Sequence, residues 1–152
     1  RPHNGFTALM AAAAAMHEKT ASALLQKGAS VDKTDLQGFS ALLHAARHGH
    51  EGVARTIIIG GANMSVVRAN GMNALHEAAA AGHEGVVRLL IEEKAMINVV
   101  TSDGMTALML ASREGNEQSL LMLLQRGARL NPVSIDGLTA LGHAKNIHVA
   151  RR

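Results

Sequence analysis

The stretch that decides the fold is GMNALHEAAAAGHEGVVRLLIEEKAMIN, residues 71–98. It opens with a glycine, passes through Asn73 into an alanine-rich run that stops at Gly82, and then carries the aliphatic pair Leu90 and Ile91. Asparagine is a favoured helix N-cap, and glycine often ends a helix because it adopts the left-handed conformation. The stretch therefore predicts two short helices separated by a tight turn.

The same pattern recurs along the chain with a period of 33 residues and no insertion. The glycine that opens each unit is found at Gly5, Gly38, Gly71, Gly104 and Gly137. Alanine and leucine follow three residues later in every unit, as in Ala41-Leu42 and Ala74-Leu75. A fixed period of this length indicates one supersecondary unit per repeat, stacked on its neighbours to bury a continuous core.

Each unit also carries the signals that begin and end two helices. An N-cap residue precedes the first helix, namely Thr7, Ser40, Asn73, Thr106 or Thr139. The second helix carries an aliphatic pair and closes at Gly28, Gly61 or Gly127, with Lys94 at the equivalent position of the third unit. These signals predict a helix, a turn, a second helix and an extended loop in every unit.

The third unit, with Gly71 and the pair Gly82-His83, resembles the ankyrin repeat. The signature of that family is Gly-x-Thr-Pro-Leu-His-x-Ala, followed by Gly-His, Leu-Leu and Gly-Ala. The resemblance covers essentially the whole chain. Two features depart from it, because the family's proline is alanine in all five units and its histidine survives only as His76.

The resemblance implies an all-α fold, an ankyrin-repeat solenoid of helix-turn-helix units joined by β-hairpin-like loops. We expect a single domain over residues 1–152, with units at about 2–34, 35–67, 68–100 and 101–133 and a truncated fifth unit at 134–152. Solenoids normally end in polar capping repeats, and neither end of this chain resembles one. We therefore expect a segment of a longer chain or a subunit of a larger assembly.

The composition limits the class of protein. Apolar residues make up 47% of the chain, aromatic residues only 1%, and there is no cysteine, so neither a disulfide nor a thiolate metal site can form. The longest apolar run, from Ala8 to Met16, has nine residues, far fewer than the ~20 that a membrane span needs. We expect an intracellular protein, in the cytoplasm, the nucleus or an organelle.

Nine histidines raise the question of a metal site. His44 and His48 are four residues apart and share a helix face, a spacing that suits zinc. A metal site needs further ligands, and the sequence places no cysteine or carboxylate beside them. The family resemblance implies a structural role for the histidine after the turn, at His17, His50 and His83. We therefore predict no metal site and no cofactor.

The sequence contains no recognisable catalytic motif. A cysteine nucleophile is absent, and neither a Gly-x-Ser-x-Gly elbow nor a phosphate-binding Gly-x-x-x-x-Gly-Lys loop occurs. The glycines are spread along the chain at the turns, as the repeat requires. We predict that the protein is not an enzyme.

The resemblance implies a protein-protein interaction scaffold that binds a partner protein through its concave groove of loop tips and first helices. We expect the partner-binding residues to be the apolar residue after each repeat glycine, two loop valines and three polar residues of the first helices. They are Phe6, Phe39, Met72, Met105, Leu138, Val67, Val100, Arg47, His48 and Arg113. Val133, Leu36 and Ile135 join them at the loop tips. Alternatively, some of the apolar residues pack on the adjacent loop.

A second function stays open, the binding of nucleic acid or another anionic surface through arginines. The net charge is +3, and Arg47, Arg113 and the terminal pair Arg151-Arg152 are the candidate contacts. However, basic and acidic residues are interspersed, and the sequence lacks a basic stripe with stacking aromatics. We therefore expect a protein partner rather than nucleic acid.

Overall fold

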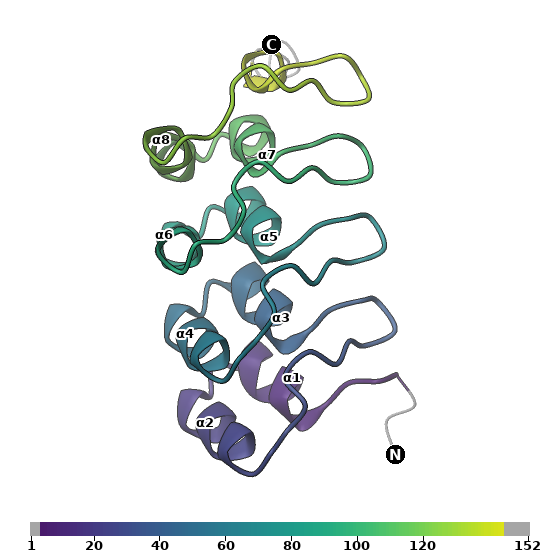
Figure 1. The fold of residues 1–152 in the computed structure, drawn as a ribbon, viewed down its shortest axis with the longest axis vertical. Helices are drawn as coiled ribbons and strands as arrows, with labels where there is room; N and C mark the ends of the chain where they lie inside the picture. Colours follow the sequence, from purple (N-terminus) through teal and green to yellow (C-terminus); the bar gives the residue numbers. More distant parts are fainter. Residues whose placement is uncertain (1–3, 145–152) are drawn as a thin grey trace.

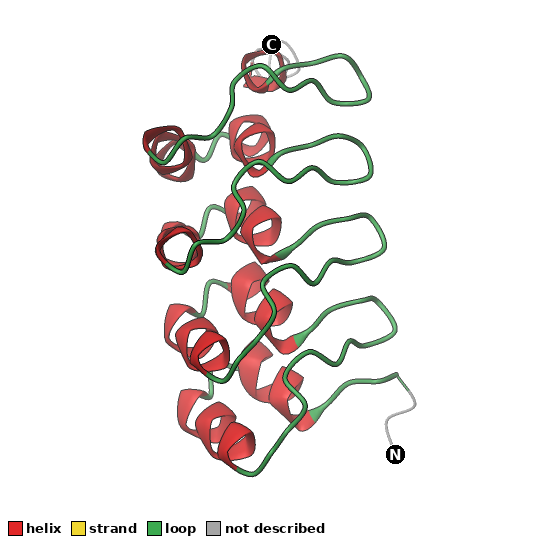
Figure 2. Ribbon diagram, in the orientation of Figure 1, coloured by secondary structure: helices red, strands yellow, loops and turns green. Residues whose placement is uncertain are grey.

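The computed structural model describes residues 4–144, which form a stack of helical hairpins (Figures 1 and 2). The helices are α1 (Ala8–Ala14), α2 (Glu18–Gln26), α3 (Ala41–His48), α4 (Glu51–Ile59), α5 (Ala74–Ala81), α6 (Glu84–Glu92), α7 (Ala107–Glu114) and α8 (Glu117–Gln125). A further helical segment covers residues 140–144, and no β-strand occurs within the described residues. The expected all-α solenoid with one helix pair per unit is confirmed. The remainder of the expected fifth unit, residues 145–152, lies outside the described residues.

The first helix of each complete unit begins at the predicted N-cap. The side chains of Ser40 and Thr106, for example, accept hydrogen bonds from backbone N–H groups three residues later, at 3.3 and 3.2 Å. Three of these helices end at a glycine in the left-handed conformation, with φ between 73° and 76°. In the first unit Met16 takes this conformation, and in the third unit Lys94 takes it after the second helix. The predicted turn position at Lys94 is therefore correct, and Met16 is a second turn residue without glycine, which the sequence analysis did not name.

The helices form two rows, with α1, α3, α5 and α7 in one and α2, α4, α6 and α8 in the other (Figure 1). Alanines of the first helices are buried completely, as at Ala45 and Ala78, and their small side chains let neighbouring first helices pack closely. The second helices add larger core residues, among them Ile57, Leu90 and Leu123. The core therefore runs through the whole stack between the two rows.

The loops between units are hairpin-like and project from the row of first helices, away from the second helices (Figure 2). In the second unit the N–H of Asp35 donates to the carbonyl of Phe39 at 3.0 Å, and the equivalent bond recurs in the next three units. Neighbouring loops are also joined, because the N–H of Leu36 donates to the carbonyl of Asn4 at 3.0 Å. This pairing orients the loop side chains that are considered below.

The histidine after the turn links the second and third units to the units that precede them. His50 Nδ1 lies 2.8 Å from the carbonyl oxygen of Ala13, and His83 Nε2 lies 2.9 Å from that of Arg47. His50 Nδ1 and His83 Nε2 must each carry the proton and donate, since a carbonyl oxygen can only accept. The structural role expected for His50 and His83 is confirmed.

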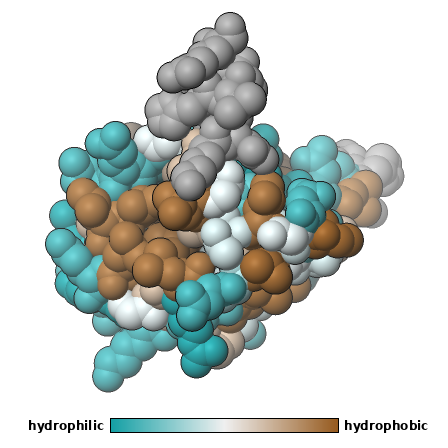
Figure 3. All heavy atoms as spheres, turned by 90° about the horizontal axis from the view of Figure 1, so that it is seen from above, coloured by the Kyte–Doolittle hydropathy of each residue, from teal (hydrophilic) through white to brown (hydrophobic). Residues whose placement is uncertain are grey.

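Apolar residues gather at the C-terminal end of the stack (Figure 3). The leucine at the start of the first helix is buried in the four complete units, but its equivalent in the fifth, Leu141, is 62% exposed. The described part of the fifth unit contains no second helix that would cover it.

None of the helices in residues 4–144 combines the length and the apolar character that a membrane span requires.

Candidate protein-interaction surface

The residue after each repeat glycine turns toward the helices rather than outward. Phe39 is 1% exposed and Met105 5% exposed, while Phe6, Met72 and Leu138 are half-buried. The expectation that Phe39 and Met105 face a partner is therefore wrong. The Phe39 ring stacks on His44 of the first helix and is covered by Arg68 of the next loop. For Phe39 the alternative, packing on the adjacent loop, is correct.

The loop valines remain on the surface as the sequence predicted. Val67, Val100 and Val133 occupy the same position in successive units and are 47%, 48% and 55% exposed. Leu36 and Ile135, at the tips of two loops, are more exposed still. These five exposed apolar side chains lie where the sequence predicted them, near the tips of the loops.

A row of polar pairs lies between the loops and the first helices. The loop residue of each pair lies three positions before the repeat glycine. Its partner lies on the first helix, nine positions after the loop residue in the sequence. Three units have such a pair: Asp35 Oδ2 with His44 Nε2 at 3.0 Å, Arg68 Nη1 with Glu77 Oε1 at 2.8 Å, and Ser134 Oγ with His143 Nε2 at 3.1 Å. The sequence reasoning missed these pairs, although both positions recur with the 33-residue period. The residue types of the pair differ from unit to unit. We therefore interpret each pair as a link between loop and helix rather than as a catalytic group.

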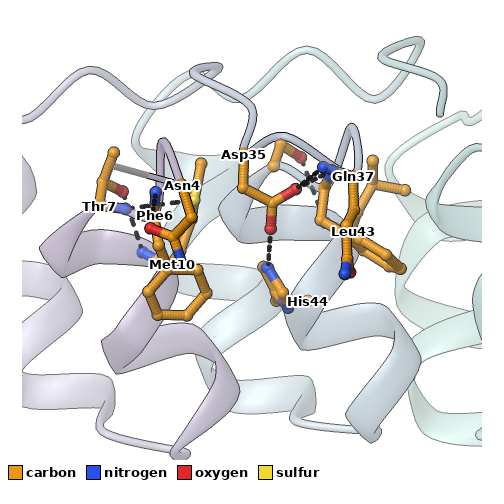
Figure 4. Close-up of polar contacts among 10 residues, drawn as sticks. Asn4, Phe6, Thr7, Met10, Asp35, Gln37, Leu43 and His44 are labelled. Carbon is orange, nitrogen blue, oxygen red and sulfur yellow. Dashed lines mark hydrogen bonds and ion pairs between the residues drawn. The ribbon is translucent and has the colours of Figure 1, made fainter. Parts of the chain in front are cut away.

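The Asp35 carboxylate is held from several sides (Figure 4). It accepts hydrogen bonds from the backbone N–H groups of Gln37 and Phe39 at 2.9 and 3.0 Å, as well as its contact with His44. Burial by itself would raise the pKa of Asp35, but these hydrogen bonds outweigh it and hold the pKa below its ordinary value. The carboxylate therefore stays ionised over the whole physiological range.

The structure changes the expectation about the surroundings of the histidine pair. The sequence placed no carboxylate near His44 and His48, yet folding brings Asp35 against His44. The two imidazole rings are nearly parallel, with centroids 6.4 Å apart. No group of three or more His, Cys, Asp or Glu residues in the described part of the chain is arranged to hold a metal ion.

Phe39 is the centre of a cluster of cationic and protonatable groups. The His44 ring stacks on it at a centroid distance of 4.9 Å. The guanidinium carbons of Arg68 and Arg47 lie 4.1 and 5.1 Å from its centroid. These are cation-π distances. The buried ring therefore positions Arg47, whose side chain is itself exposed.

The exposed polar residues of the first helices differ between units. Arg47 and His48 lie at the end of α3, and Arg113 lies at the end of α7, where it contacts Glu114 at 2.9 Å. Partial burial lowers the pKa of His48, and the neighbouring His50, His44, Arg47 and His83 lower it further. The predicted basic cluster Arg151-Arg152 lies outside the described residues.

A family model described as ankyrin repeats (three copies) matches residues 1–67 and 53–134. The chain belongs to the ankyrin repeat family. Ankyrin repeats generally serve as protein-protein interaction modules, and proteins built from them are typically non-enzymatic scaffolds. No curated protein matches this chain. The interaction surface must therefore be argued from the chain's own residues.

Proposed function

We propose that this ankyrin-repeat chain is a scaffold that binds a partner protein through one surface of its loops and first helices. This surface, called the inner surface below, is formed by Val67, Val100, Val133, Arg47, His48 and Arg113. The observation that supports it is the row of exposed valines at one repeat position. An aligned row of exposed apolar residues is a typical feature of an interaction site, whereas scattered ones are ordinary.

The size of the inner surface suits an extended strand or a helix of the partner. Helices of neighbouring units pack at roughly 8–10 Å, so three units span about 20–30 Å. The half-buried Phe6, Met72 and Leu138 keep part of their apolar area accessible on the same loops. Arg47 and Arg113 would set the orientation of the partner more than its affinity, as charges at the rim of an interface commonly do.

The test is a comparative capture experiment with three forms of the protein. These are the wild type, the double variant Val67→Asp/Val100→Asp, and the control Ile59→Asp, whose side chain is 79% exposed on α4. A protein retained by the wild type and the control but lost from the double variant supports the inner surface. Equal retention by all three overturns it. Melting temperatures confirm that every form is folded.

The same experiment separates a protein partner from nucleic acid. Binding dominated by phosphate contacts weakens steeply with salt, whereas contacts to exposed valines respond little to it. Loss of the bound material after nuclease treatment or a modest rise in salt would favour the anionic-surface alternative. The proposal includes three further expectations. The protein acts without catalysis or a cofactor, it works inside the cell, and it is part of a larger assembly.

A further inference from the structure

The second unit brings one arginine and three histidines close together at the inner surface. The exposed Arg47 and His48 lie at the last turn of α3, and the His48 ring is 6.4 Å from that of His44 and 5.7 Å from that of His50. The equivalent positions on the two neighbouring first helices hold only alanine, at Ala14-Ala15 of the first unit and Ala80-Ala81 of the third. The α3 patch, defined as Arg47, His48, His44 and His50, therefore stands between two uncharged faces.

Arg47 is held in place without being neutralised. Its guanidinium lies over the Phe39 ring at 5.1 Å, and its backbone carbonyl accepts the hydrogen bond of His83. Among the described residues it forms no ion pair, whereas the equivalent Arg113 is bound to Glu114. A contact with an aromatic face fixes a guanidinium but leaves its charge available to a carboxylate.

The acidic groups on the elements around α3 are already engaged. On the loop, Asp35 contacts His44. On α5, the buried Glu77 contacts Arg68. On α4, Glu51 contacts Arg55 at 3.2 Å and Arg88 at 3.5 Å.

The remaining titratable groups near the patch do not supply a negative charge. Helix α1 (ALMAAAA) contains no ionisable residue. His76 of α5 is buried and bonded to the carbonyl of Val99. His50 and His83 each donate to a backbone carbonyl of the preceding unit. The carboxylates around the α3 patch are therefore already paired with His44 or with arginines other than Arg47, and a negative charge for Arg47 and His48 would have to come from a partner.

We propose that the α3 patch binds an acidic segment of the partner protein, and that this binding tightens as the pH falls from about 7.5 to about 5.5. The inference rests on the proposed function, because it needs the inner surface to be the docking site. Aspartate and glutamate side chains remain ionised across this range, while histidine becomes protonated. Partial burial and then the neighbouring cationic groups hold the pKa of the free His48 below its ordinary value, and a bound carboxylate raises it.

The sign of the pH dependence follows from proton uptake. If the bound state holds His48 at a higher pKa than the free state, binding takes up a proton, so acid favours the complex. A difference of one pKa unit corresponds to about tenfold tighter binding of the protonated form.

The patch suits an acidic peptide better than a nucleic acid. Nucleic acids are bound through many phosphate contacts along a basic stripe. The patch is limited to one unit, with alanine at the same positions of the first and third units and the balanced Arg113-Glu114 pair in the fourth. One or two carboxylates would match it.

The test uses a 12-residue alanine-based helical peptide with two glutamates four residues apart, which places both on one face. The matched control peptide carries glutamine at both positions. Proton NMR titrations of the histidine resonances are recorded with each peptide, and His48→Gln identifies the resonance of His48. Arg47→Gln and the equivalent Arg113→Gln are compared with the wild type.

We expect the glutamate peptide to raise the pKa of His48 by about one pH unit, and the glutamine peptide to leave it unchanged. Fluorescence anisotropy should give about fivefold tighter binding of the glutamate peptide at pH 5.5 than at pH 7.5, because the two pH values do not cover the whole titration of His48 in both states. The His48→Gln variant should lose most of this dependence. Arg47→Gln should weaken binding severalfold, and Arg113→Gln should bind like the wild type.

Three outcomes would overturn the inference. The first is equal binding of the two peptides, and the second is an unchanged pH dependence of binding in His48→Gln. The third is a single-stranded oligonucleotide that binds more tightly than the glutamate peptide and is weakened equally by Arg47→Gln. Failure of the proposed function is recognised separately through Val67→Asp/Val100→Asp. If that variant loses the partner while the two peptides bind alike, only the acidic preference is wrong. If it retains the partner, the inner surface itself is wrong.

Discussion

The guanidinium carbon of Arg68 lies 4.1 Å from the centroid of the Phe39 ring. Arg68 belongs to the loop that opens the third unit and Phe39 to the second, so the contact joins two repeats. The same guanidinium donates to Glu77 at 2.8 Å, and both side chains of this ion pair are largely withdrawn from solvent. The ion pair and the ring together form a polar link between the second and third units.

Removing one member of this ion pair should destabilise the protein. Arg68→Met leaves the Glu77 carboxylate buried and unpaired, and we expect a loss of about 3 kcal/mol. The double variant Arg68→Met/Glu77→Gln removes the buried charge as well and should recover a large part of that loss. Urea unfolding of the wild type, both single variants and the double variant gives the coupling energy. Additive effects would show that the two residues do not depend on each other.

We expect that replacing Phe39 destabilises the fold, whereas replacing a residue exposed on the loops does not. Because its ring is almost fully buried, Phe39→Ala should lower the free energy of unfolding by about 3 kcal/mol or more. Val67→Ala removes a half-exposed side chain and should change it by no more than about 0.5 kcal/mol. Thermal unfolding of the two variants provides the comparison. A larger effect at Val67 than at Phe39 would contradict the packing described here.

Lys94 should be a site of backbone strain. It follows α6 with φ of 65°, where the other three complete units have glycine, at Gly28, Gly61 and Gly127. A side chain is disfavoured in this region by roughly 1–2 kcal/mol, so Lys94→Gly should stabilise the protein by about 1 kcal/mol. The control is Gly127→Ala, because an added Cβ there meets no atom within 4 Å and reports the conformational cost alone. Gly127→Ala should destabilise by a similar amount, and a destabilised Lys94→Gly would count against the assignment.

His76 should make the protein sensitive to acid. Its Nε2–H donates to the carbonyl of Val99 at 3.0 Å, and its Nδ1 accepts from the N–H of Asn73 at 3.2 Å. Burial lowers the pKa of His76 below 6.5, so the unfolded chain binds more protons below that pH. Stability is therefore greatest above about pH 6.5 and falls as the pH drops toward the lower pKa of the folded state.

The matched variant for this effect is His76→Met, since the equivalent Met10 already accepts the N–H of its N-cap through sulfur at 3.4 Å. At pH 7.5 it should lose about 1 kcal/mol, the usual net value of a hydrogen bond. Between pH 7.5 and 5 its stability should fall less steeply than that of the wild type, although His48 and His143, whose pKa values are also lowered, keep part of the slope. Parallel curves would show that His76 does not carry the dependence.

The repeat period, the helix boundaries and the family were determined by the sequence alone. Each depends on an interaction within a few residues. The side chain of Ser40 caps the helix that starts at the next residue, and Gly49 ends that helix because it takes a positive φ. Even the Lys94 exception could be read from the register, since the neighbouring units place glycine there. Such signals need no knowledge of distant contacts.

The candidate surface was predicted only in part. The exposed valines and the helix residues Arg47 and His48 followed from the repeat position. The inward direction of Phe39 and Met105 did not, because it depends on how each loop folds over the first helix. An apolar residue in a loop has the same sequence signal whether it faces a partner or the core.

Only the tertiary structure brought Asp35 to His44 and Arg68 to Glu77. A separation of nine residues across a turn matches neither the helical nor the strand period, so no local rule places these side chains together. The charge state of the α3 patch depends on the same contacts, since they decide which carboxylates are already bound. Local hydrogen bonds and backbone preferences therefore determined the repeat, whereas packing between loop and helix decided which side chains remain free to meet a partner.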